Sequence, residues 1–320
     1  MTWNIINTLD ITGAAEARSA LESVGHLTDL APDRSLVLDN LADCDAYMAS
    51  AVVRIDGKFL ACAPNLRLIG SPHTGRDHLD LASIEERGIK LFTITAEREL
   101  LDGFTATSEL AFGLLLTLVR RIPQALAAAS AADWARERFT GFQLSGKTFG
   151  VVGLGRLGTI SARIASGFGM RVLAHDIAER MAPGVEIVEF DALLQESDVV
   201  SVHVHLSNET RGLFDGPVFA KMKAGAILLN TSRGAVVDDA ALMDALESGH
   251  LGGAGLDVID GEWLSSKELA RHPLIRYARD HDNLIIVPHI GGATLESIYG
   301  ARVFMARKMA GYLRALEGQE

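Results

Sequence analysis

Ionisable side chains follow short apolar runs at three places in the second half of this 320-residue chain. The segments are NTSRGAVVDD, which contains Arg233, GLDVIDGEW, which contains Asp257 and Glu262, and VPHIGG, which contains His289. Short apolar runs predict buried parallel strands, and ligands of open parallel sheets bind beyond the carboxyl ends of the strands. We therefore expect the four side chains to lie together at one edge of a sheet.

Three of these side chains have the chemistry to reduce a 2-oxo acid. The planar guanidinium of Arg233 can donate to a carboxylate and to the adjacent carbonyl, which it would also polarise. His289 has an ordinary pKa of about 6.5, so it can protonate the alkoxide that hydride transfer creates and accept the proton in reverse. Glu262, bonded to the other ring nitrogen, would orient the imidazole and raise its pKa. Taken alone, Arg233 also fits a surface ion pair and His289 a structural hydrogen-bond donor.

A glycine-rich turn precedes these segments, in the stretch TFGVVGLGRLGT over residues 148–159. Apolar residues before the glycines predict a strand, and those after them, at steps of three and four, predict a helix. The predicted apolar face of this helix consists of Leu157, Ile160, Ile164 and Phe168. Gly153 would allow the tight turn, Gly155 would let the backbone approach a pyrophosphate, and Gly158 would let the helix pack on the strand. The stretch therefore predicts a dinucleotide site at the start of the helix.

The next apolar run, RVLAHD, ends at Asp176 in the same strand–helix–strand unit. A carboxylate there can accept hydrogen bonds from the adenosine ribose and repels a 2′-phosphate, which favours NAD over NADP. An aspartate at a strand end also caps helices or forms turns, and Asp176 alone fits that role equally well. In combination with the glycine turn, it predicts an NAD site.

The composition predicts a globular protein without a nucleic-acid partner. Hydrophobic residues make up 48% of the chain and charged residues 22%, and the length allows two domains with cores of their own. The net charge is −11, and the sequence has no run of lysines and arginines that would bind a phosphate backbone.

The sequence also predicts a cytoplasmic location and no membrane partner. The beginning, MTWNIINTLD, lacks the positive segment followed by an apolar core that a signal peptide has. The longest apolar stretch, Leu110–Val119, is about half as long as the roughly 20 residues that a spanning helix needs. Cys44 and Cys62 are the only cysteines, too few for a disulfide framework, which suits a reducing compartment.

Alternating strand and helix signals divide the chain into two α/β series. The first, from Asn4 to about Ile94, has strands at NIINTL, 45–48, LRLIG and IKLFTI and a helix at 14–24. A long apolar helix at 109–121 and an alanine-rich helix at 125–132 follow it.

The second series starts at Lys147 and alternates in the same way. It has predicted strands near residues 150, 172, 199, 227, 255 and 286 and helices at 215–223 and 238–247. A final helix follows, with one apolar stripe that consists of Ile298, Ala301, Met305, Met309, Tyr312 and Leu316. Two such series predict two parallel-sheet domains.

Six motifs in order carry a resemblance to a known family: LRLIGSPHTGRDHLDL, LSGKTFGVVGLGRLG, VSVHVHLSNETRGLF, LLNTSRGAVVD, GAGLDV and PHIGGAT. The chain resembles the D-isomer-specific 2-hydroxyacid dehydrogenases, among them the phosphoglycerate dehydrogenases. The resemblance implies an NAD-dependent enzyme that interconverts a D-2-hydroxy acid and a 2-oxo acid. It further implies a Rossmann NAD-binding domain at 100–292, a flavodoxin-like substrate domain from 1–99 and 293–320, and a cleft between them.

The resemblance also assigns roles to residues of this chain. The implied catalytic residues are Arg233, Glu262 and His289. The implied cofactor-binding residues are Gly153, Gly155, Arg156, Leu157, Gly158, Asp176, Thr231, Asp257, His289 and Gly291. The implied substrate-binding residues are Arg54, His73, Thr74, Gly75 and Arg233. A homodimer is implied as well, through surfaces of the NAD-binding domain that include the helix at 109–121.

Three residues depart from the family pattern and leave the substrate open among glyoxylate, hydroxypyruvate and 3-phosphohydroxypyruvate. His73 stands where the family usually has glycine in the substrate loop, and His205 and Trp263 stand where it usually has proline. His203 and His205 would share a strand face, but without a third ligand at a suitable spacing they predict no metal site. A binding protein of the same fold, such as an NAD(H) sensor or corepressor, is the alternative to an enzyme.

Overall fold

The computed structural model describes residues 2–318, which form two compact units, each with a parallel sheet. The discontinuous unit contains the described residues up to Phe104 and those from Thr294 onward, and the central unit contains Thr105–Ala293. These boundaries lie a few residues beyond the predicted ones. Every strand pair in both sheets is parallel, so the predicted fold class is confirmed.

The sheet of the discontinuous unit has five strands in the flavodoxin-like order β2-β1-β3-β4-β5. Its strands are β1 (Trp3–Asn7), β2 (Gly25–Asp29), β3 (Ala46–Met48), β4 (Leu68–Ser71) and β5 (Lys90–Thr93). Its helices are α1 (Ala15–Glu22), α2 (Arg34–Asp39), α3 (Gly57–Cys62), α4 (Leu81–Glu86), α5 (Arg98–Asp102) and α14 (Leu295–Glu317). Strand β2 is absent from the sequence prediction because GHLTD is a partly exposed edge strand without a continuous apolar run.

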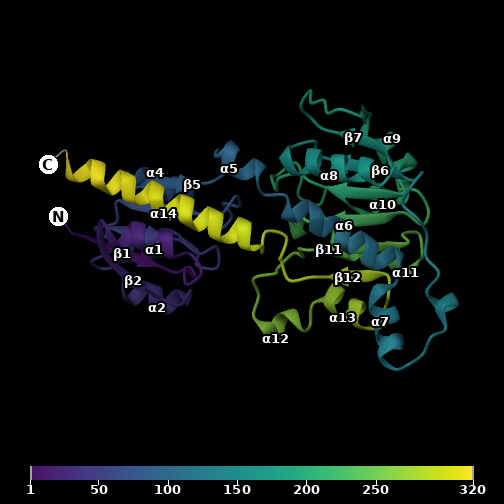
Figure 1. Ribbon diagram of the computed structural model, residues 1–320, viewed down its shortest axis with the longest axis horizontal. Helices are drawn as coiled ribbons and strands as arrows, with labels where there is room; N and C mark the ends of the chain where they lie inside the picture. The colour runs from purple at the N-terminus through teal and green to yellow at the C-terminus, as the bar shows by residue number, and fades with distance from the viewer. Residues whose placement is uncertain (1, 319–320) are drawn as a thin grey trace. The chain divides into compact units, whose positions relative to one another are not determined.

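Helices bury both faces of this sheet. Ile5 packs with α1 and α14, whereas the next residue, Ile6, packs with α2, α3 and α4, as the alternation of a strand requires. The two helices α14 and α1 run side by side (Figure 1). A Cβ atom added to Gly70 of β4 would lie 2.2 Å from Sδ of Met309, so α14 packs closely on the sheet. The last helix is therefore part of the core that the first strands build.

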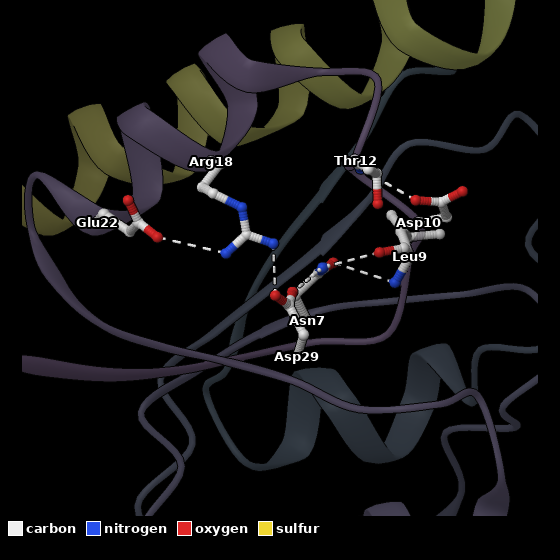
Figure 2. Close-up of polar contacts among 7 residues, drawn as sticks. All are labelled: Asn7, Leu9, Asp10, Thr12, Arg18, Glu22 and Asp29. Atoms are coloured by element: carbon white, nitrogen blue, oxygen red, sulfur yellow. Dashed lines mark hydrogen bonds and ion pairs between the residues drawn. The ribbon is translucent and has the colours of Figure 1, made fainter.

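Polar side chains fix the carboxyl end of β1 (Figure 2). The buried Asn7 amide donates to the carbonyl of Leu9 at 2.8 Å and to Oδ1 of Asp29 at 2.7 Å, and its oxygen accepts from the Leu9 N–H at 3.1 Å. Arg18 of α1 donates to Asp29 and to Glu22. These bonds join β1, β2 and α1 where the chain leaves the first strand.

The central sheet has seven strands in the order β12-β11-β10-β9-β6-β7-β8, which is the Rossmann order with β12 added at one edge. Its strands are β6 (Thr148–Val152), β7 (Arg171–His175), β8 (Val185–Ile187), β9 (Val199–Val202), β10 (Ile227–Asn230), β11 (Gly253–Leu256) and β12 (Leu284–Ile286). Strand β8 is absent from the prediction because its three residues form a partly exposed edge.

Two buried clusters cover the two faces of the central sheet, with Val151 in one and Val152 in the other. The helical elements of this unit are α6 (Ala106–Val119), α7 (Ile122–Ser130), η1 (Arg136–Phe139), α8 (Arg156–Gly167), α9 (Phe190–Glu196), α10 (Gly216–Lys221), η2 (Gly234–Val236), α11 (Asp239–Glu247), α12 (Ser266–Leu269) and α13 (Pro273–Asp280). The run Arg98–Val119 has the length and composition of a membrane-spanning helix. Its α6 part, however, buries Phe112 and Leu115 against the central sheet, as a core helix does.

Helix α8 buries only part of the predicted apolar face: Ile160 is buried and Leu157 and Ile164 are half-buried, whereas Phe168 is exposed. Its buried residues are Gly158, Ile160, Ser161, Ala162 and Ala165. The prediction followed large apolar side chains, whereas a helix that lies close to a strand needs small ones at the contact. Phe168 is 37% exposed, and its ring stacks on Phe112 of α6 at a centroid distance of 5.5 Å.

Candidate active site

The glycine turn between β6 and α8 has the shape that a pyrophosphate requires. Gly153 has φ of +95°, which side-chain-bearing residues rarely adopt. A Cβ atom on Gly158 would lie 2.1 Å from the carbonyl oxygen of Gly153, so the helix start touches the turn. A Cβ atom on Gly155, in contrast, would have no heavy atom of residues 2–318 within 4 Å. Backbone N–H groups at the start of α8 thus border open space, as a helix-terminal anion site needs.

Asp176 directly follows β7 and holds the glycine turn in place. Its Oδ2 accepts from the N–H of Leu154 at 2.7 Å, and its Oδ1 accepts from the N–H of Ala178 at 2.8 Å. Nε of Arg180 lies 3.6 Å from Oδ2. The structure therefore gives Asp176 the turn-forming role and also places its carboxylate beside the predicted phosphate site.

The turn after β10 carries Thr231 and Arg233. Asn230, the last residue of β10, donates to the carbonyl of Arg233 at 2.9 Å and accepts from the N–H of Ser232 at 3.0 Å. The hydroxyl of Thr231 is buried and has no hydrogen-bond partner within the part of the chain that the structure describes. An unpaired buried hydroxyl is costly, so it fits a site where a polar ligand group completes the bond.

Asp257 anchors the loop that carries His289. It is buried directly after β11, and its oxygens accept from the N–H groups of Ile290 at 2.6 Å and Gly291 at 2.9 Å. Its carbonyl accepts from the N–H of His289 at 2.9 Å. Burial raises the pKa of the Asp257 carboxyl, and the two N–H donors oppose that rise. Both oxygens are used within the protein, so contact with a cofactor remains a prediction for this residue.

His289 and Glu262 form a hydrogen-bonded pair beyond the carboxyl ends of β12 and β11. Nδ1 of His289 lies 2.9 Å from Oε1 of Glu262, and the histidine backbone has φ of +52°. This left-handed conformation is uncommon outside glycine and is often found at functional sites. The hydrogen bond to Glu262 raises the pKa of His289, while burial and the positive charge of Arg233 lower it. Arg233, Glu262 and His289 all belong to the central unit, and the charge of Arg233 acts on the pKa of His289.

Apart from Arg233, the predicted substrate-binding residues lie in the discontinuous unit, after neighbouring strands. Arg54 is exposed in the loop after β3, and 73–75 follow β4. Nδ1 of His73 lies 3.2 Å from the hydroxyl of Ser71, and Nε2 of His78 lies 3.3 Å from the same hydroxyl. These bonds fix the histidine that departs from the family pattern.

His203 has a structural environment. Its Nε2 lies 2.9 Å from the hydroxyl of Ser201, and burial lowers its pKa to about 4. Within residues 2–318, no group of three or more possible metal-ligating side chains occurs.

Two functional contributions were not predicted. Asn230 shapes the turn that presents Arg233, and Asp257 anchors the loop of His289. The role of Asn230 could have been predicted from the sequence, because an asparagine at the end of the apolar run ILLN indicates a turn.

Comparison with known proteins identifies the family of this chain. The model of the D-isomer specific 2-hydroxyacid dehydrogenase NAD binding domain matches residues 112–291, and that of the family's catalytic domain matches residues 10–99. The chain belongs to this family. It is an NAD-dependent D-2-hydroxyacid dehydrogenase, with the cofactor and reaction class that the sequence predicts.

Relatives and solved structures cover most of this dehydrogenase. It is 36% identical over 295 residues to glyoxylate reductase of Thermococcus litoralis, which is 89% of this chain and 85% of that protein. It is 34% identical to D-3-phosphoglycerate dehydrogenase of Mycobacterium tuberculosis over 83% of this chain, but only 48% of that protein. D-lactate dehydrogenase from Aquifex aeolicus, crystallised with NAD and lactic acid, superposes with a TM-score of 0.85 at 28% identity, over 98% of this chain and 96% of that one. These relatives are enzymes, which favours an enzyme over a sensor.

Proposed function

We propose that Arg233, Glu262 and His289 are the catalytic groups of this dehydrogenase. The observation that carries the proposal is the 2.9 Å bond between Nδ1 of His289 and Glu262, which leaves Nε2 as the nitrogen that exchanges a proton with the substrate. The hydrogen bond to Glu262 raises the pKa of His289, which favours the charged ring that a proton donor requires.

Each group has one task in the reduction of a 2-oxo acid. Arg233 binds the substrate carboxylate and polarises the adjacent carbonyl. NADH, when held by the central unit, would supply the hydride for the carbonyl carbon. His289 gives its Nε2 proton to the carbonyl oxygen, so that a hydroxyl forms, and Glu262 stabilises the charged ring before the transfer. In the oxidation of the hydroxy acid, neutral His289 takes the hydroxyl proton back.

We further propose that the central unit holds NAD and that residues of the discontinuous unit bind the substrate. The NAD-binding residues would be Gly153, Gly155, Arg156, Leu157, Gly158, Asp176, Thr231, Asp257, His289 and Gly291. The open space at Gly155 and the unpaired hydroxyl of Thr231 support this assignment. Arg54 and the loop of His73, Thr74 and Gly75 would contact the substrate from the discontinuous unit.

The test is NADH oxidation with a panel of 2-oxo acids. We expect turnover with the parent protein and a loss of at least about a hundredfold in kcat/KM for Arg233→Ala and His289→Asn, because each removes a group that acts in the transition state. Arg279→Ala, on the exposed side of α13, is the matched control and should retain activity. Parent activity that survives in both site variants would contradict the assignment.

A homodimer in the cytoplasm is the proposed state of the enzyme. Exposed apolar side chains gather between residues 122 and 142 of the central unit, where Leu126 is 63% exposed and Trp134 is 82% exposed. Such side chains favour burial in an interface. The predicted contact through 109–121 stays part of this proposal, and the segment 122–142 extends it. Light scattering should give the mass of a dimer, and Leu126→Glu should shift it toward the monomer.

A further inference from the structure

Trp263 lies beside the proposed proton donor. Its ring centroid is 5.9 Å from that of His289, with 42° between the ring planes, which is within the range of aromatic contacts. The side chain is 62% exposed, an unusual exposure for the largest apolar residue. The residue therefore presents a broad apolar surface next to the imidazole of His289.

The backbone on both sides of Trp263 is fixed. Gly261 turns the chain with φ of +74°, and its carbonyl accepts from the N–H of Leu264 at 3.0 Å. Glu262 is bound to His289, and Ser265 caps α12 through reciprocal bonds with Glu268. The hydrogen bonds of Glu262 and Ser265 thus fix the backbone on either side of Trp263, which keeps the indole beside the imidazole.

The surroundings of Trp263 in the central unit are apolar and acidic. Leu264 is 46% exposed and Ile290, next to His289, is 41% exposed. Asp257 and Glu262 add negative charge, and both act on the pKa of His289. Arg233 is the cation that acts on the pKa of His289. The substrate carboxylate would bind to its guanidinium, which leaves it unable to bind a second anionic group. A second anionic group on the substrate would find acids and apolar side chains here.

The proposed role of His289 places the substituent on C2 of a 2-oxo acid near this surface. When Nε2 of His289 donates to the carbonyl oxygen, the substituent begins two bonds from that oxygen and lies beside the imidazole. We propose that Trp263 determines substrate specificity, selecting 2-oxo acids with an uncharged apolar or aromatic substituent over glyoxylate and phosphorylated acids. The inference rests on the proposed role of His289 and goes beyond it by naming the substrate class.

The test compares kcat/KM for phenylpyruvate, 4-methyl-2-oxopentanoate, glyoxylate and 3-phosphohydroxypyruvate at saturating NADH. We expect the parent enzyme to prefer the two apolar acids over glyoxylate by at least about tenfold, the discrimination that a hydrophobic pocket can supply. Trp263→Ala should lower this ratio by about tenfold, mainly through KM of the apolar acids, and Trp263→Phe should retain most of it. Leu36→Ala, the truncation of an exposed apolar side chain on α2 of the other unit, should leave the ratio as it is.

Two results would overturn the inference while leaving the proposed catalytic set in place. One is a parent enzyme that prefers glyoxylate or 3-phosphohydroxypyruvate, and the other is a ratio that stays constant in a folded Trp263→Ala variant. Circular dichroism and NADH binding identify variants that fail to fold. If the folded parent protein binds NADH and reduces none of the four acids, the proposed function fails and the specificity falls with it.

Discussion

His289 sets the pH dependence of the reaction, because only its charged form can donate the proton in reduction. The hydrogen bond to Glu262 raises the pKa of His289 above its ordinary value of about 6.5. We expect kcat/KM for reduction to hold below the raised pKa and to fall as pH rises through it. Oxidation needs the neutral ring, so its kcat/KM should fall as pH decreases through the same pKa. Glu262→Gln removes the negative charge, and both limbs should then move to lower pH.

The measurement is kcat/KM from pH 5 to 10 in both directions. Glu247→Gln, an exposed glutamate at the end of α11, is the control and should keep the parent profile. If kcat/KM of Glu262→Gln falls at the same pH values as in the parent while chemistry limits the rate, a group other than His289 titrates.

The sequence indicates which side chains take part in the reaction, but not which hydrogen bonds position them. Arg233, Glu262 and His289 can be found because each lies shortly after a short apolar run, where parallel sheets place their ligands. The anchoring of the His289 loop by Asp257 joins residues 33 positions apart, and no local pattern predicts that bond. His289, with its positive φ, lies in the same anchored loop.

The β6–turn–α8 element separates two roles of glycine that the motif alone does not distinguish. At Gly155 an added methyl group meets no described atom within 4 Å, and the backbone is extended. Gly155→Ala should therefore keep or slightly raise the melting temperature, by reducing the freedom of the unfolded chain, while KM for NADH rises at least about tenfold. At Gly158 the methyl group would collide with the carbonyl of Gly153. Gly158→Ala should lower stability by about 1–3 kcal/mol as well as NADH affinity.

Thermal melts without cofactor and NADH titrations distinguish the two variants. Equal melting temperatures for Gly155→Ala and Gly158→Ala would contradict the structure of the turn. The elements that the sequence does not predict, β2 and β8, are edge strands, where partial exposure removes the apolar run on which the prediction depends. The buried face of α8 is also hard to predict, because most of its residues are small and give little apolar signal.

The whole molecule consists of two units whose cores do not share residues. Both clusters of the central sheet contain only residues of Thr105–Ala293, and both clusters of the other sheet contain only residues outside that range. The order of strand and helix signals was sufficient to predict two parallel sheets. That α14 returns to the first sheet follows from the family resemblance, because its apolar stripe alone does not identify the partner.

Separate cores predict that the central unit folds alone. A chain of residues 105–293 keeps the glycine turn, Asp176 and the His289–Glu262 pair, so it should melt cooperatively and bind NADH, but it should not reduce a 2-oxo acid without the proposed substrate loops. Residues 1–104 alone should fail to fold, because the core of this unit would lose Met305, Met309 and Leu313 of α14. Circular dichroism melts and NADH fluorescence titrations test both fragments. An unfolded 105–293 fragment would mean that the central core depends on the other unit, and a folded 1–104 fragment would mean that α14 is dispensable there.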